Sequence, residues 1–597
     1  MKLLVLCLIV IANVSYNGKA SIESIDPGNT NILLTDTTKN ADKSCYRPCK
    51  YNVKPRRCQY NFKIEPTVGD DGRPTLVIND MTPGPPIHVC VNDIVIVKVQ
   101  NKVPGQDMAI HWHGVEQKGT PYMDGVPMVT QCPIGFGSTY EYAFIASSPG
   151  TFFYHADAVA HQSDGVYGSL IVDQPQPLEP HSSLYDFDRS KEHTLILAAR
   201  FPEMLSGNLD GKQLKPDSLV INGEEKSMKI FVIPGYTYRL RLINAVAVEC
   251  PLIVDIEHHN MIVIASDSKP VKPMSADKVM LYPGERMDVV VEAVHKSGGY
   301  WVNVRGGNEC EGLTAHGMLL YSGFNYTSLL DQGPGGKTLN NDVPSIKQKI
   351  ISGQRLLSLQ EENLSKDVKS IYLAVDKHVI PFNDKDNDYR YLSDVTPKKN
   401  FYPAAVSLQD RGVVQINNKN FLYPNDPYLI KPRNVRPDTI CNVGDEMMNK
   451  QLQCLQVLKI HDKKVVELVF INEGFGSNDS YTFHMHGYSM RVLATGQSKD
   501  GKPISKSEFQ LLDKRGKIER NLRNPPIKDT FIVPNKGYTI LRLNADRGGS
   551  WMLECRSCGF FSLPVAILID VPITIPKSVV DVLPKCGSYK PADVLLN

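Results

Sequence analysis

Short runs of β-branched and aliphatic residues recur along the chain at positions 94–99, 168–172, 289–292, 465–470 and 565–569. Runs of this length, punctuated by Gly, Pro and Asn, predict strands of β-sandwiches. The chain of 597 residues is too long for one core and suits three domains of roughly 130–170 residues each. We therefore predict an all-β protein with sandwich domains at about residues 60–175, 190–325 and 425–575.

The stretch between the second and third domains has poor periodicity. Residues 326–424, rich in Gly, Asn, Asp and Lys from 331 to 402, predict a linker before the third domain. Residues 21–59 are expected to form a cysteine-containing N-terminal segment and residues 576–597 a C-terminal tail.

The first 20 residues predict a secretory signal peptide. Lys2 supplies the positive start, residues 3–12 the apolar stretch, and Gly18 and Ala20 a small-residue cleavage site. The apolar stretch is too short to cross a bilayer, no second long one follows, and the C-terminal end resembles no anchor. We expect a secreted, extracellular protein without a membrane span.

Charge and cysteine content agree with this location. The formal net charge is +2, and the chain has no basic run, so no nucleic acid or anionic membrane partner is expected. Removing Cys7 with the signal peptide leaves an even number of cysteines, which suits disulfides in an oxidising compartment. Acceptor sequons at Asn325, Asn363 and Asn478 predict glycosylation, although unmodified asparagine remains an alternative at each.

A histidine pattern repeats along the chain with variations. It is found at His111–Gly114 (HWHG), His155–Asp157 (HAD), His484–Gly487 (HMHG) and Glu554–Arg556 (ECR). Side chains at positions i and i+2 of a strand point to one face, so two histidines with this spacing can bind adjacent metal ions. Imidazole ligands suit copper and zinc.

Many further motifs accompany these histidines in a characteristic order. They are Gln117–Thr120, Asp124–Pro127, Gln131–Ile134, Gly150–Phe152, Asp164–Gly165, Arg241–Ala245, Gly284–Arg286, Asn524–Pro526 and Lys528–Thr530. From about residue 45 to 586 the chain resembles the laccase-like multicopper oxidases, and the insect laccases most closely. The resemblance implies three cupredoxin-like Greek-key β-sandwich domains and a disulfide between Cys90 and Cys586. It also implies a type 2 copper and a type 3 copper pair between the first and third domains, and a type 1 copper in the third.

The resemblance assigns a ligand position to each motif residue. The type 2 positions are His111 and His484; the type 3 positions are His113, His155 and Arg556 for one ion and Asp157, His486 and Glu554 for the other; the type 1 positions are Tyr481, Cys555 and Phe560, with Val565 axial. Half of the family's ligand histidines are thus present, and so is Asp124, which the resemblance places behind the ligands.

The replaced positions suggest a degenerate copper site. Both type 1 imidazoles are replaced, and Cys555, with Cys558 three residues later, is expected in a disulfide or as a buried thiol. Arg556 carries a permanent positive charge into a position meant for neutral imidazole. We expect Arg556 to pair with Asp157 or Glu554 and to help hold the first and third domains together.

These observations lead to three hypotheses. The first is a secreted protein without laccase activity that acts by binding an extracellular protein or a phenolic ligand, with at most one copper or zinc at the residual histidines and no full four-copper set. The alternative is an oxidoreductase, laccase-like or ferroxidase-like, that uses residual copper or another divalent metal. A structural extracellular scaffold is the third. Buried histidines that merely hydrogen-bond in the interface would also account for His113 and His155.

Overall fold

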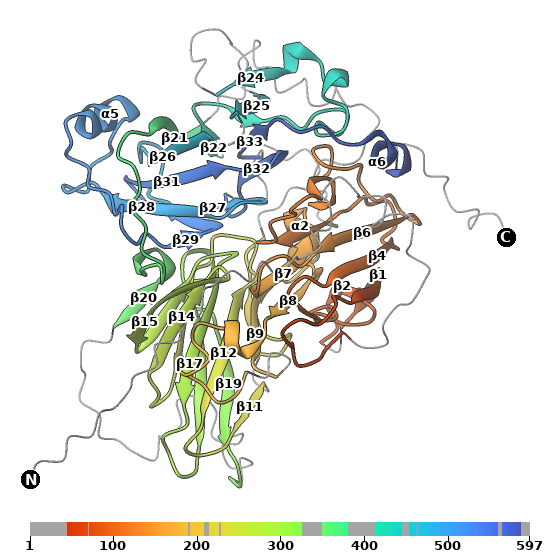
Figure 1. Ribbon diagram of the computed structural model, residues 1–597, viewed down its shortest axis with the longest axis vertical. Helices are drawn as coiled ribbons and strands as arrows, with labels where there is room; N and C mark the ends of the chain where they lie inside the picture. The colour runs from red at the N-terminus through yellow and green to blue at the C-terminus, as the bar shows by residue number, and fades with distance from the viewer. Residues whose placement is uncertain are drawn as a thin grey trace, which may run out of the picture.

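Three β-sandwiches form the protein, as the computed structural model shows in Figure 1. The first is coloured orange, the second yellow to green, and the third teal to blue. The structure describes residues 45–69, 71–188, 192–207, 214–225, 228–324, 349–379, 412–443, 453–461, 464–558, 564–584 and 586. The predicted all-β fold with three cupredoxin-like domains is confirmed.

The first sandwich combines two sheets of four described strands each. Their orders are β2 (Pro74–Ile78), β1 (Arg57–Val68), β4 (Ile94–Asn101), β6 (Thr139–Ile145), and β3 (Ile87–Cys90), β8 (Tyr167–Asp173), β7 (Gly150–Ala156), β5 (Ile110–His113). Because β1 runs parallel to β4, and β3 to β8, connections must cross between the sheets. A short helix, α2 (Val159–Ser163), follows β7.

The second sandwich combines two sheets of six described strands each. Their orders are β10 (Ser218–Ile221), β9 (Thr194–Arg200), β12 (Thr237–Asn244), β17 (Arg286–Glu292), β14 (Met261–Ser266), β15 (Lys269–Ala276), and β11 (Lys229–Val232), β19 (Thr314–Tyr321), β18 (Gly299–Gly306), β13 (Leu252–Ile256), β16 (Lys278–Leu281), β20 (Ile350–Ser352). Their inner faces bury one continuous aliphatic core.

The third sandwich also has two sheets, which extend toward the N-terminus beyond the expected boundary. Their strands are β22 (Gly412–Ile416), β21 (Lys369–Val379), β26 (Lys464–Asn472), β31 (Gly537–Ala545), β28 (Met490–Gln497), β29 (Ile527–Lys528), and β23 (Asn420–Phe421), β25 (Gln453–Lys459), β33 (Ala566–Val571), β32 (Gly549–Cys555), β27 (Tyr481–Met485), β30 (Thr530–Val533), with β24 (Ile440–Asn442) beside β25. The segment 326–424 therefore is not only a linker, because β20, β21 and β22 join neighbouring sheets. The helix α5 (Lys506–Lys514) packs near β21.

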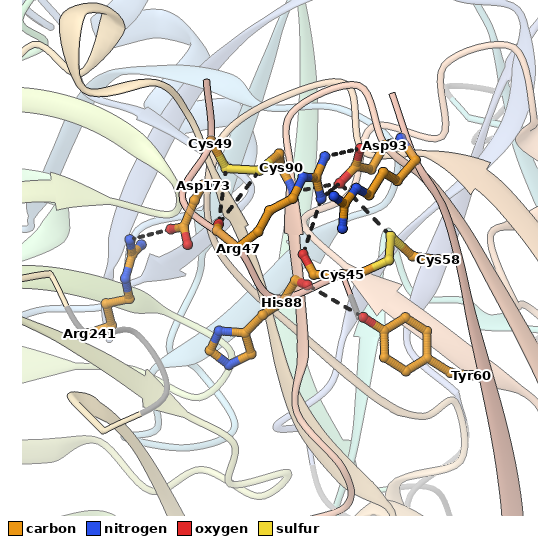
Figure 2. Close-up of a disulfide and its surroundings, with 11 residues drawn as sticks. Cys45, Arg47, Cys49, Cys58, Tyr60, His88, Cys90, Asp93, Asp173 and Arg241 are labelled. Atoms are coloured by element: carbon orange, nitrogen blue, oxygen red, sulfur yellow. Dashed lines mark hydrogen bonds and ion pairs between the residues drawn. A yellow bond between two sulfur atoms is a disulfide. The ribbon is translucent and has the colours of Figure 1, made fainter. Parts of the chain in front are cut away.

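Two disulfides hold the N-terminal segment on the first sandwich (Figure 2). Cys45 is bonded to Cys58 at the start of β1, and Cys49 to Cys90 at the end of β3. Between them the Arg47 guanidinium donates to both oxygens of the buried Asp93 carboxylate, at 2.7 and 2.8 Å. A bidentate charged pair of this kind fixes orientation as well as position.

The C-terminal end is attached to the first sandwich by a different bond from the one that the family resemblance implied. Cys586 is bonded to Cys132, so the expected Cys90–Cys586 pair is wrong. The helix α6 (Lys577–Val582) explains the difference, because its Val579 and the following Leu583 are buried in the first domain's core. This packing brings residue 586 to Cys132, while Cys90 is already bonded to the N-terminal segment.

Several expectations fall on residues beyond this description. Residues 1–44, Asn325 and Phe560 lie outside the described part of the chain. Asn363 and Asn478 are exposed, which glycosylation requires, and their modification stays a prediction. Among the described helices, none has the length and apolar character needed to cross a membrane. The six disulfides seen in the described residues suit an oxidising compartment.

The Cys132–Cys586 disulfide should contribute strongly to stability. It closes a separation of 454 residues, whereas Cys441–Cys454 closes 13. A disulfide lowers the entropy of the unfolded chain, and this effect grows with the length of the loop that it closes. In the chain-entropy account, removing the Cys132–Cys586 disulfide should therefore lower the free energy of unfolding by about 3 kcal/mol more than removing Cys441–Cys454. The Cys132→Ser/Cys586→Ser variant should therefore melt at a lower temperature than the Cys441→Ser/Cys454→Ser variant, as measured by calorimetry. Equal melting temperatures would contradict this ranking.

Candidate metal centre

Five histidines meet at the interface of the first and third domains. β5 carries His111 and His113, and its neighbour β7 carries His155 directly opposite His111 in the antiparallel register. In the third domain, β27 carries His484, and His486 follows one residue after its end. All five rings are almost completely buried.

Strand alternation explains why these side chains share one face. On β5 the intervening Trp112 points into the core of the first domain, packed against Tyr142 and Phe144. On β27 the intervening Met485 lies in the core of the third domain. The aromatic and aliphatic residues thus anchor each strand while the histidines face the other domain.

Two pairs of imidazole nitrogens face each other at short range. Nε2 of His111 lies 3.2 Å from Nε2 of His484, across the domain interface. Nδ1 of His113 lies 3.2 Å from Nε2 of His155. The rings of His113 and His484 stack with centroids 3.6 Å apart, so the two pairs form one cluster.

The partners of the outer nitrogens fix the tautomers of the first pair. Nδ1 of His111 lies 2.8 Å from the carbonyl oxygen of Asp124, and Nδ1 of His484 lies 3.1 Å from that of Asp529. A carbonyl oxygen only accepts, so each Nδ1 must carry the hydrogen. The two Nε2 atoms therefore face each other as lone pairs.

The second pair is fixed in the same way. Nδ1 of His155 donates to the carbonyl oxygen of Ala156 at 2.8 Å. The Thr530 hydroxyl donates to Asp529 at 2.9 Å and lies 3.0 Å from Nε2 of His113, which donates to it. Nε2 of His155 and Nδ1 of His113 are left as facing lone pairs.

Burial keeps these imidazoles neutral. Desolvation lowers the pKa of His111, His113 and His155 well below the usual range, and that of His484 in the same direction. The neighbouring imidazoles and, for His155, the guanidinium of Arg556 add to the effect. Neutral imidazole is the form that binds metal ions.

His486 differs from the other four because two carboxylates surround it. Its Nδ1 lies 2.9 Å from Asp124 and its Nε2 3.3 Å from Glu554. Desolvation lowers its pKa, but the carboxylates outweigh burial and raise the pKa to about 9. Its ring also lies against that of His111, tilted by 35° with centroids 3.8 Å apart, so it belongs to the same cluster.

Arg556 is neutralised by its neighbours. The guanidinium donates to Glu554 at 2.8 Å, to the Gln162 side chain at 2.7 Å and to the backbone carbonyl of Asp157 at 3.2 Å. The expected pairing with Glu554 and the link between first and third domains are confirmed, whereas Asp157 contributes only its backbone. The Asp157 carboxyl remains buried with Oδ1 unpartnered, and desolvation, with nearby Glu554, raises its pKa to about 7.

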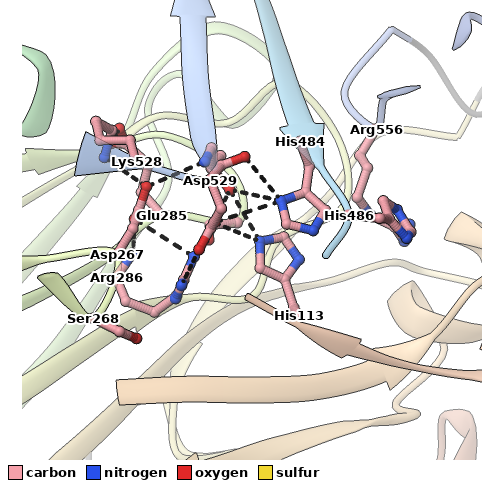
Figure 3. Close-up of polar contacts among 12 residues, drawn as sticks. His113, Asp267, Ser268, Glu285, Arg286, His484, His486, Lys528, Asp529 and Arg556 are labelled. Carbon is pink, nitrogen blue, oxygen red and sulfur yellow. Dashed lines mark hydrogen bonds and ion pairs between the residues drawn. The ribbon is translucent and has the colours of Figure 1, made fainter. Parts of the chain in front are cut away.

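The second domain supports the cluster through buried ion pairs (Figure 3). Arg286 donates to both oxygens of Asp529 at 2.6 Å, and the Asp529 carboxylate lies between that guanidinium and the rings of His113 and His484. Lys528 pairs with Asp267 at 2.8 Å, also from the second domain. A Cβ at position 114 would overlap Arg286, which explains the glycine after the HWH sequence.

The sequence did not predict a role for these supporting residues at the metal centre. Arg286, Asp529 and Thr530 lie in the family motifs of residues 284–286 and 528–530, so the signal was present in the sequence. Only the fold shows that these motifs meet behind the histidines. Gln162 carried no motif signal, and its contact with Arg556 is visible only in the structure.

The donor set fits metal ions. Three overlapping groups, His111/His484/His486, His111/His113/His155 and His113/His484/Asp529, each place their ligand atoms within 4.8 Å of one another. Two nitrogens bound to one ion at about 2.0–2.1 Å are roughly 3–3.4 Å apart, which matches both 3.2 Å pairs. A cation would also relieve the facing lone pairs of the two imidazole pairs.

The positions that the resemblance gives to the type 1 copper look different. Cys555 is bonded to Cys558, which confirms the expected disulfide. The buried Tyr481 hydroxyl lies 2.9 Å from the Ser477 hydroxyl, and Val565 is buried nearby. A sulfur in a disulfide does not supply the thiolate that binds copper.

Three family models, each described as multicopper oxidase, match residues 63–177, 193–323 and 422–557. The chain belongs to the multicopper oxidase family. It is 27% identical to laccase-2 of Botryotinia fuckeliana over 83% of this chain and 79% of that protein. It is 26% identical to L-ascorbate oxidase of Cucumis sativus over 80% and 82%, respectively. The solved laccase of Botrytis aclada has a TM-score of 0.66 at 22% identity, covering 90% of this chain and 94% of that one, which shows the shared fold.

These findings overturn the expectation of a degenerate copper site in a protein that acts by binding. That expectation treated each ligand position as independent of the others. The structure instead brings all five histidines into overlapping metal-binding groups, as expected of a multicopper oxidase that keeps its central copper cluster. The repulsion expected from Arg556 is offset by Glu554. The oxidoreductase alternative fits better.

Thr530 should control metal affinity because one hydroxyl accepts from two histidines, at 3.0 Å from His113 and 3.1 Å from His484. Thr530→Val keeps the shape of the side chain but frees both rings to change tautomer or rotate. Copper affinity, measured by competition with a chelator of known strength, should fall about 10–100-fold.

Thr495→Val is the matched control. The Thr495 hydroxyl bonds to that of Thr539 on the neighbouring strand, in the sheet of the third domain that does not contain His484 and Thr530. This variant should leave the affinity unchanged. Equal affinities of Thr530→Val and wild type would show that the hydroxyl does not position the ligands.

Proposed function

We propose that this multicopper oxidase is an active oxidoreductase that transfers electrons from an organic reductant to O2 at a copper cluster held by the five histidines. The facing lone pairs carry the proposal. A protein that used these histidines only for interface hydrogen bonds would be expected to direct an N–H toward each acceptor, whereas here both pairs oppose acceptor to acceptor.

The histidines have separate roles in this proposal. His111 and His484 bind one ion from two domains, and His113 with His155 binds a second. Copper bound there supplies the one-electron redox steps that O2 reduction needs. Imidazole sites of this type favour copper over zinc by intrinsic affinity.

Carboxylates around the cluster orient ligands and balance charge. Asp124 contacts His486 through its carboxylate and His111 through its carbonyl. Asp529 takes the charge of Arg286, so this cation does not face the cluster unpaired. The six described disulfides and the signal peptide predicted over residues 1–20 support secretion to the extracellular space, with glycans at Asn363 and Asn478 as a further proposal.

The first test is the copper content together with the reaction with O2. We expect about two coppers or more per chain, because the histidines provide two opposed nitrogen pairs. Protein reduced anaerobically with dithionite and freed of reductant should then consume O2 on mixing, followed with an oxygen electrode. This assay depends on no organic substrate.

His111→Ala should lose both copper and O2 consumption, since His111 belongs to two of the three ligand groups. His461→Ala is the matched control, because His461 is exposed on the third domain. Wild-type protein that retains no copper after loading and desalting would refute the proposed function.

A further inference from the structure

We propose that the Cys555–Cys558 disulfide is a redox-active centre through which a dithiol substrate supplies electrons to the copper cluster. The inference rests on the proposed function and names its substrate class. It starts from a spacing: Cys555-Arg556-Ser557-Cys558 places two residues between the cysteines, as in thiol–disulfide oxidoreductases.

The disulfide lies next to the histidine cluster along the chain and in space. Cys555 pairs with Phe483 across β32 and β27, and the preceding Glu554 pairs with His484. The Glu554 carboxylate reaches Nε2 of His486 at 3.3 Å. The residue next to Cys555 in the chain is therefore in contact with the cluster.

The two sulfurs differ in access. Cys555 is 9% exposed at the end of β32, whereas Cys558 is only half-buried. Because thiol–disulfide exchange depends on access to the attacked sulfur, an external thiolate should attack Cys558. Another described short-range disulfide, Cys441–Cys454, lies on β24 and β25, which pair with neither β27 nor β32.

A buried acid lies beside the disulfide. Glu249, from the second domain, contacts the Thr482 hydroxyl at 3.3 Å and also hydrogen-bonds with Ser557, whose hydroxyl oxygen lies 4.0 Å from the sulfur of Cys555. Desolvation raises the pKa of Glu249 to about 8. This carboxyl can exchange protons near the sulfurs around neutral pH, which suits a dithiol–disulfide couple.

The electron balance closes with O2 as the oxidant. A thiolate of the donor attacks Sγ of Cys558, the Cys555–Cys558 bond breaks, and Cys555 leaves as a thiolate. The donor's second thiolate attacks the donor sulfur of the mixed disulfide and releases Cys558. When the Cys555–Cys558 bond forms again, two electrons go to the copper cluster and two protons are released. Two donor dithiols thus reduce one O2 to two water molecules.

The first experiment follows the thiols rather than turnover. The disulfide is reduced in the metal-free full chain, reductant is removed, and samples are loaded anaerobically with Cu(I) or with redox-inert Zn(II). After exposure to air, alkylation and peptide mass analysis should show Cys555 and Cys558 bonded again at least about tenfold faster with copper than with zinc. Equal rates would overturn the inference.

The second experiment traps the donor. The probe is a reduced Cys-Gly-Gly-Cys peptide, and its Cys-Gly-Gly-Ser form, which lacks the second thiol, is the trap. Under anaerobic conditions the trap should open the wild-type disulfide and accumulate as a mixed disulfide on Cys558, seen as its added mass, with Cys555 left as a free thiol. The Cys555→Ser/Cys558→Ser variant should keep its copper and the O2 consumption that follows dithionite reduction, but lose O2 consumption driven by the peptide. The control variant Cys441→Ser/Cys454→Ser should keep its copper, the O2 consumption after dithionite reduction and the O2 consumption driven by the peptide.

These outcomes separate the two proposals. If dithionite-reduced wild type consumes no O2, the proposed function fails. If it does, but the peptide drives O2 consumption equally in the Cys555→Ser/Cys558→Ser variant, or drives none in wild type, the dithiol inference alone is refuted. Copper lost from that variant would indicate misfolding, and the mixed disulfide on Cys558 then decides.

Discussion

The buried contact between Arg286 and Asp529 is the interaction on which the arrangement of the cluster depends. It joins the second domain to the third, and the same carboxylate accepts from Thr530, which accepts in turn from His113 of the first domain. One acid thereby links all three sandwiches. Because both charges are fully buried, removing either partner would leave the other uncompensated, at a cost of about 3–5 kcal/mol.

Burial and hydrogen bonding act together on the histidines. Desolvation disfavours the imidazolium form, and acceptors behind the rings place the remaining hydrogens on the outer nitrogens. The balance is reversed at His486, where two carboxylates outweigh desolvation and favour the imidazolium form. The cluster therefore offers four neutral ligands and one that must release a proton to bind a cation, so metal uptake is coupled to proton release.

The sequence predicted the fold and the residues of the cluster well. Strand runs and glycine punctuation are local signals, and HWHG and HMHG identify their own strands, so both could be interpreted without coordinates. The Cys132–Cys586 bond could not, because it depends on where α6 docks, and that docking is a packing outcome of Val579 and Leu583. The linker was overestimated for a similar reason: β21 and β22 gain their place by pairing with strands distant in sequence.

The mistaken expectation of a degenerate site shows why replaced ligands are hard to interpret singly. Arg556 alone in an imidazole position would repel cations, but Glu554 forms an ion pair with it, and the two charges neutralise each other. Gln162 and the Asp157 carbonyl then hold the guanidinium at the edge of the cluster. Arg556 and Glu554 therefore act as a pair whose charges cancel. The same reasoning applies to Cys555, to which the resemblance gives the type 1 thiolate position, because Cys558 holds its sulfur in a disulfide. In each case a second residue pairs with the side chain at a ligand position and forms a different chemical group, an ion pair or a disulfide, near the histidine cluster.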